Sequence, residues 1–227
     1  FMKKITFILL MSVCFSLFAG EKPRCTIDLK GSKSGYEMVF SADSLVFFGV
    51  DYSRVKLIGD HGNVSGSTMP LDHIRDTYFN SINEVVMNEQ KKFNFEKATD
   101  GKKISYDFTS VLAANKSAKT DDMKAITATK PLDLNVVAEM VKGYSSSAAK
   151  GSVGMVLIVD QMNKFEEAAY FYVTFFDTDS KKLLFTAYVK GKAGGFGYRN
   201  YWAGAIASVV KDMTKSDWEY WEKSAKK

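Results

Sequence analysis

The chain has 227 residues and a formal net charge of +5, and 46% of its residues are hydrophobic while 14% are aromatic. This composition is typical of a globular protein and excludes an intrinsically disordered one. Two of the positive charges, Lys3 and Lys4, belong to the leader described next, and without them the net charge is +3. A net charge of +3 is too small to indicate nucleic-acid binding.

The first twenty residues have the order of a secretory signal peptide. Two lysines are followed by an apolar run over 5–18 and by the small residues Ala19 and Gly20. The run is shorter than the roughly 20 apolar residues that span a bilayer, although a retained anchor helix is the alternative. We expect residues 1–20 to be removed and the protein to be exported, periplasmic or outer-membrane-associated, with no transmembrane span after removal.

Of the two cysteines, Cys14 lies in the leader and Cys25 follows it. Neither is preceded by the small residues of a lipoprotein signal. The mature chain therefore keeps Cys25, either as an unpaired thiol near a flexible end or as half of an intermolecular disulfide.

The segment 21–34 is polar and is predicted to be a loosely ordered lead-in. The apolar run 45–50 then predicts a buried strand, and the alternation over 55–59 predicts a second strand segment. Between them, 51–53 is either a bulge or a corner.

Glycine, asparagine and serine over 59–69 predict a loop. A helix is expected over 70–91, because a proline opens it and apolar residues recur at spacings of three and four. Alternation over 104–108 predicts a short strand. The polar stretch 113–130 is predicted to be the least ordered internal segment, or a peripheral helical turn.

The carboxyl-terminal half is the most strongly patterned. Asp133 is suited to cap a helix that reaches Tyr144. Three apolar runs with short connections follow and predict an antiparallel meander; they are 153–159, 168–176 and 183–189. A long helix comes next, and Ser216 with Glu219 predicts a capping box before a separate final helix that carries Trp218 and Trp221.

This order predicts a single α/β (α+β) sandwich over 35–227. We expect a mixed, mostly antiparallel sheet covered by three or four helices. Three prolines and no internal repeat argue against a linker within the chain. The oligomeric state stays open.

The stretch GKAGGFGYRNYWAGA, residues 191–205, holds the main candidate binding residues. They are Gly194, Gly195, Gly197, Tyr198, Arg199, Asn200, Tyr201 and Trp202. A glycine-rich turn before a helix can bind an anion, but the Walker and dinucleotide patterns are not matched. Two other interpretations are open. The stretch is a tight turn whose aromatic residues fill the core, or it is a surface for a protein partner, because Tyr, Trp and Arg dominate the energetics of interfaces.

A second polar spot is formed by Asp51 and Arg54, which interrupt an apolar strand. Two interpretations are open: a functional polar site at the end of the sheet, or a structural feature, namely a buried or edge ion pair or a bulge. Beyond the leader only His61 and His73 are present, without a cluster of thiolates, so we expect no metal and no cofactor.

No catalytic constellation stands out. There is no GxSxG elbow, and the serines of 62–67 after His61 have the composition of an ordinary loop. Neighbouring carboxylates are predicted to be solvated surface groups; they occur at 121–122, at 166–167, and at Asp177 with Asp179. A hydrolase with an unidentified site remains an alternative.

The stretches FFGVDYSRVKLIG, GMVLIVDQMNK, VTFFD and GKAGGFGYRNYWA together resemble an uncharacterised family of secreted bacterial cell-envelope proteins. The resemblance covers most of 44–213 and implies the envelope as location, but no activity. In element order alone, the end of the chain is also similar to accessory domains of curli-export and Tol-type proteins.

Three functions are open. The first is an envelope accessory protein that contacts a protein partner through aromatic residues near 194–202 or through Trp218 and Trp221. The second is a periplasmic binding module for a small molecule, lipid or glycan. The third is the hydrolase.

Overall fold

An eight-stranded mixed sheet forms the centre of the molecule. The computed structural model describes residues 25–61, 63–64, 67–146 and 150–225, so the predicted leader and residues 62, 65 and 66 of the loop after His61 lie outside the described residues. The main strand order is β1 (Thr26–Gly31), β10 (Leu183–Lys192), β9 (Ala168–Asp177), β8 (Val153–Asn163), β2 (Ser44–Asp51) and β6 (Lys103–Tyr106). The short strands are β3 (Lys56–Ile58), β7 (Lys124–Ala125) and the separate pair β4 (Asn63–Val64) and β5 (Ser67–Thr68).

In the eight-stranded sheet, the strands β1, β10, β9 and β8 pair antiparallel, whereas β2 and β3 pair parallel with their neighbours. β8, β9 and β10 form the predicted meander, and β1 pairs with β10. β2 lies parallel to both β8 and β6, while β3 continues beside the last residues of β8. The predicted α/β class with a mixed, mostly antiparallel sheet is therefore confirmed.

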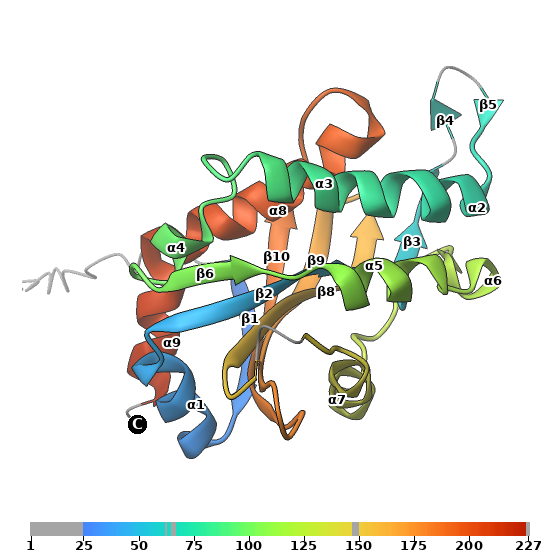
Figure 1. Ribbon diagram of the computed structural model, residues 1–227. Helices are drawn as coiled ribbons and strands as arrows, with labels where there is room; N and C mark the ends of the chain where they lie inside the picture. The colour runs from blue at the N-terminus through green and yellow to red at the C-terminus, as the bar shows by residue number, and fades with distance from the viewer. Residues whose placement is uncertain (1–24, 62, 65–66, 147–149, 226–227) are drawn as a thin grey trace, which may run out of the picture.

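Helices cover both faces of the sheet, unequally. They are α1 (Lys33–Ser41), α2 (Leu71–His73), η1 (Ile74–Phe79), α3 (Asn80–Asn88), α4 (Phe95–Ala98), α5 (Thr109–Lys116), α6 (Thr120–Met123), α7 (Leu134–Lys142), α8 (Gly197–Asp212), η3 (Met213–Asp217) and α9 (Trp218–Ala225). The larger core lies between the sheet and the helices α1, α3, α8 and α9, and a smaller core lies under α7 (Figure 1). No helix in the described part of the chain is long and apolar enough to cross a membrane.

The smaller core shows why α7 forms where the pattern predicts it. The Asp133 side chain accepts a hydrogen bond from the backbone N–H of Asn135 and caps the helix. Val137 and Val141, one turn apart, are fully buried against the sheet. β8 between the two cores is buried along its whole length, because both of its faces are covered.

Two local predictions are wrong, and a third holds only in its alternative form. The lead-in predicted over 21–34 is ordered in its described part, because β1 pairs with β10 there and α1 begins at Lys33. The polar stretch 113–130 includes the end of α5 and β7, and the short helix α6 within it is the helical turn predicted as the alternative. No capping box separates the last helix, since η3 joins α8 to α9 and the Ser216 hydroxyl donates to the Asp212 carbonyl instead.

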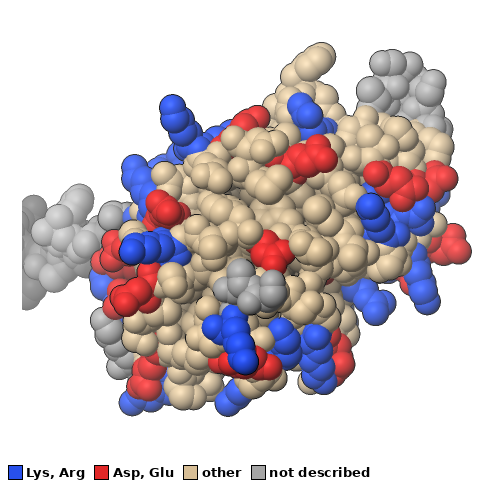
Figure 2. Space-filling view, viewed as in Figure 1, with Lys and Arg blue, Asp and Glu red and all other residues tan. Residues whose placement is uncertain are grey.

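The helix predicted over 70–91 is present but ends at Asn88 and contains a π-helical stretch, η1. Figure 2 shows basic and acidic side chains mixed around the margin of the face that α3 and β6 cross, with few charges at its centre. This face therefore carries no continuous field of one sign.

Candidate functional site

The glycine-rich stretch is a tight connection between β10 and α8. Gly195 and Gly197 have φ values of +131° and +77°, a region that favours glycine. The Gly194 N–H donates to the Tyr201 carbonyl at 2.9 Å, and a Cβ on Gly204 would lie 2.0 Å from the Gly194 oxygen. The connection is therefore packed directly onto the first turns of α8.

Most of its aromatic residues face inward. Trp202 is only 1% exposed and Tyr198 is also buried, while Tyr201 is half-buried beneath the Lys164 ammonium, 4.3 Å from its ring centroid. Phe196 instead is 96% exposed. The eight predicted residues thus do not converge on a cavity, and the buried Trp218 and Trp221 are not a contact surface either.

His61 is the buried partner of this connection. Its ring stacks on Trp202 with 5.2 Å between the centroids. The Nε2–H donates to the Met162 carbonyl at 2.9 Å, because a carbonyl can only accept, and Nδ1 accepts from the Tyr198 hydroxyl at 3.0 Å. Burial lowers the pKa of His61 to about 4.

These contacts make His61 a neutral, structural histidine. His73 is exposed at the end of α2, and its ring contacts Tyr78. Within the described ranges, no group of three or more His, Cys, Asp and Glu side chains is close enough to hold a metal ion. The carboxylate of Asp177 accepts from Ser180 at the predicted β9–β10 turn, which is the structural role expected for it.

The second predicted spot, Asp51 and Arg54, lies at a corner of the sheet. Gly49 has a φ of +98° at a register shift between β2 and β8. The buried side chain of Asn83 accepts from the Val50 N–H at 2.8 Å, and that of Asn115 accepts from the Tyr52 N–H at 2.6 Å. Two asparagines from α3 and α5 therefore hold the backbone where β2 leaves the edge of β8 and β3 replaces it.

The Asp51 carboxyl is buried at this corner, only 1% exposed. It accepts from the Tyr144 hydroxyl at 2.5 Å and from the Ser53 N–H at 2.6 Å. Burial nevertheless raises the pKa of Asp51, and Arg54 opposes this shift without forming an ion pair with any described residue. Burial, and after it the neighbouring Asp51 carboxyl, raise the pKa of the Tyr144 hydroxyl.

The corner opens into a cavity of about 740 Å³, which is lined by residues of the β2–β3 connection, α5, α6 and α7. Figure 1 shows the arrangement of these elements. Asp51 and Tyr144 lie at its buried end. Its apolar lining residues are Val55, Ala114, Met123, Leu132, Val136 and Met140, and its charged ones are Arg54, Lys56, Lys119, Asp122 and Glu139. This volume and this mixture are typical of small-molecule sites, and the cavity lies beyond the carboxyl end of a parallel strand.

A buried polar cluster holds the wall of the cavity at Leu132. The Asp160 carboxyl accepts from the Leu132 N–H at 3.1 Å and from the Tyr188 hydroxyl at 2.6 Å. The Tyr172 hydroxyl donates to the Leu132 carbonyl at 2.8 Å. Burial raises the pKa of Asp160, whose role here is to anchor the chain before α7.

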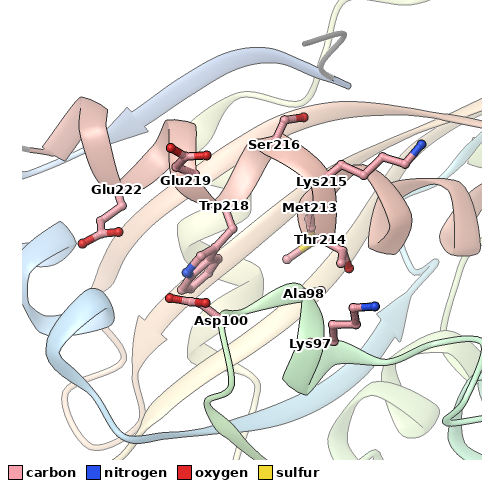
Figure 3. A pocket seen from close by; sticks show the side chains of 10 residues that line it. All are labelled: Lys97, Ala98, Asp100, Met213, Thr214, Lys215, Ser216, Trp218, Glu219 and Glu222. Atoms are coloured by element: carbon pink, nitrogen blue, oxygen red, sulfur yellow. The ribbon is translucent and has the colours of Figure 1, made fainter.

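A second hollow is smaller and of mixed charge. It has about 270 Å³ and lies between α4, η3 and α9. Figure 3 shows Glu219 and Glu222 on one side of it, Lys97 and Lys215 on the other, and the Trp218 ring near Asp100. Trp218 is buried, so the hollow has little apolar surface to offer a ligand.

Comparisons with models of known protein families and with curated proteins found no match. The resemblance to secreted envelope proteins therefore stays a prediction. Sequence reasoning found Asp51 and Arg54 but missed Tyr144, Lys119 and the pair Val136 and Met140. Only the four-residue spacing of that pair, on a second apolar stripe of α7, was a usable signal.

Proposed function

We propose that this protein is an exported binding module for a small amphiphilic molecule, which it holds in the cavity between the β2–β3 corner and α7. The observation that carries the proposal is the cavity of about 740 Å³, whose apolar wall faces charged and hydrogen-bonding groups. Export and an envelope location rest on the signal-peptide pattern of the sequence.

Two details of α7 support this function. Val136 and Met140 line the cavity and are only partly buried, whereas Val137 and Val141 are fully buried in the smaller core. Met140 also packs against that core, so it connects the cavity wall with the packed face of the helix. Methionine adapts its shape readily, so Met123 and Met140 suit a wall that receives ligands of varied outline.

A fluorescent amphiphile, anilinonaphthalene sulfonate, tests the proposal with the purified protein. We expect saturable binding, and Met140→Asp should weaken it because a charge then enters the apolar wall. Ala138→Asp is the matched control, since it adds the same charge to α7 outside the cavity lining. Equal binding by both variants would place the probe elsewhere and refute the proposed site.

A protein contact remains a second candidate, favoured by two protruding phenylalanines. Phe196 is 96% and Phe165 75% exposed. They lie on the β10–α8 and β8–β9 connections, which are neighbours because Lys192 pairs with Ala168. Under this candidate, Phe165→Ser with Phe196→Ser should abolish cross-linking to one envelope protein, whereas the equally exposed Ile126→Ser should not.

A further inference from the structure

The mouth of the cavity carries cations without partners. Among the described residues, neither the Arg54 guanidinium nor the Lys119 ammonium makes a side-chain hydrogen bond or an ion pair. Both side chains line the cavity and both residues are exposed. Lys56, the third cation of the lining, instead donates to the Asp122 carbonyl. Two positive groups at the mouth are therefore available to a ligand.

The acidic groups of the lining do not neutralise them. Glu139 lines the cavity, but its carboxylate pairs with Lys142, which is not a lining residue. Asp51 is buried, and its raised pKa favours the uncharged form. Asp122 is exposed, and its own backbone carbonyl holds Lys56. The mouth is thus more positive than the buried end.

The buried end disfavours a negative group. An anion placed there would meet the Asp51 carboxyl and would lose its hydration without a cation to replace it. Val136, Met140 and Leu132 give the same cavity an apolar wall. An apolar chain fits this wall, whereas an anionic head is stabilised only near Arg54 and Lys119.

We infer that the molecule bound here is an amphiphile with an anionic head, a carboxylate or a phosphate, which Arg54 and Lys119 bind at the mouth while its apolar chain lies against α7. This inference rests on the proposed function and specifies the ligand class of the same cavity. A guanidinium can bind either head through two parallel hydrogen bonds, so the two share one recognition chemistry.

The test compares ligands that differ only in the head, by calorimetry on the purified protein. Decanoate, decyl phosphate and decan-1-ol carry the same chain. We expect the acids to bind at least about tenfold more tightly than the alcohol, because one charge-assisted contact contributes roughly that factor. The affinity of the acids should fall as salt is added, and that of the alcohol should not.

The double variant Arg54→Gln with Lys119→Gln should reduce acid binding to the level of the alcohol. Lys150→Gln with Lys211→Gln is the control, because it removes the same charge from exposed positions outside the cavity lining. A ratio between decanoate and decyl phosphate identifies which head is preferred.

The possible failures are distinguishable. If decan-1-ol binds as tightly as decanoate, or the double variant binds decanoate unchanged, the anionic head is refuted while the binding cavity stands. If no ligand binds and Met140→Asp does not alter probe binding, the proposed function fails and this inference fails with it.

Discussion

At the scale of single residues, a few buried polar side chains hold the backbone around the cavity. Asn83 and Asn115 bind the backbone at the end of β2, and Asp160 holds the chain before α7. These contacts pair the buried donors and acceptors with hydrogen-bond partners. Without such partners, removing the polar groups from water would cost free energy of unfolding. Their positions fix the corner and the wall between which the cavity lies.

His61 should make the stability of the protein depend on pH. Its pKa in the folded state, about 4, lies below the ordinary value of 6.5. The unfolded chain therefore takes up the proton first. His61 therefore contributes up to roughly 3 kcal/mol to the free energy of unfolding. This contribution is complete above the ordinary pKa of histidine and is lost as the pH falls toward 4.

Urea unfolding of the wild type and of His61→Gln at several pH values measures this effect. The difference between them should shrink as the pH falls, because the variant lacks the titrating group. The raised pKa values of Asp51 and Asp160 act in the opposite direction, but they are present in both proteins and cancel in the comparison. A difference that does not change with pH would contradict the proton-linked role.

At the scale of the elements, the bulge in β2 is the feature on which the site depends. The strand leaves the edge of β8 after Asp51, and β3 takes its place along the last residues of β8. This break directs the β2–β3 connection away from the sheet and toward α7, where it forms one side of the cavity. A continuous strand would leave no such opening.

Gly49→Ala should destabilise the protein by about 2–4 kcal/mol, because strain and a clash act together. Gly49 has a φ of +98°, and a Cβ there would lie 2.8 Å from the Asn83 side-chain oxygen. Gly101→Ala is the control, since its φ of +85° is similar but no atom lies within 4 Å of the added Cβ. It should cost only about 1 kcal/mol in unfolding experiments.

Equal losses of unfolding free energy in the two variants would mean that only the backbone angle matters at Gly49. The contact with Asn83 would then not be needed to form the corner. A larger loss at Gly49, accompanied by weaker probe binding, would connect the bulge to the cavity.

At the scale of the whole molecule, one layer of helices is far more complete than the other. α1, α3, α8 and α9 cover the larger core, whereas α7 covers the smaller one. The cavity lies beside this single covering helix and is lined by residues of α7, α5 and α6. The arrangement thus favours a site at the margin of α7 over one in the larger core.

Export of the whole chain stays a prediction from residues 1–20. A reporter enzyme that is active only outside the cytoplasm, fused to the carboxyl end, should be active in a bacterial host. Leu9→Arg with Leu10→Arg should abolish that activity, because charges disrupt the apolar run. The control Leu9→Ile with Leu10→Ile keeps the run apolar and should keep the reporter active. If the reporter stays active in both variants, residues 1–20 do not direct export.

Local pattern sufficed for the long elements. The strand β2, the three strands of the meander, the capped helix α7 and the helix α8 follow directly from apolar periodicity, because each buries one or both faces against its neighbours. β1 and α5 escaped prediction, since their stability comes from pairing with β10 and from packing on β2, which no local pattern records. The π-helical stretch η3 replaced the predicted capping box for the same reason.

The sequence by itself determined the class of the fold, the apolar run over 5–18 and two residues of the cavity, Asp51 and Arg54. Only the tertiary structure decided that Trp202 and Tyr198 belong to the core, that Tyr144 binds Asp51 across 93 residues of chain, and that Lys119 and Met140 line the same cavity. The physical reason is that periodicity reports which side chains avoid water, whereas a binding site is formed by residues from separate elements that come together only when the core packs.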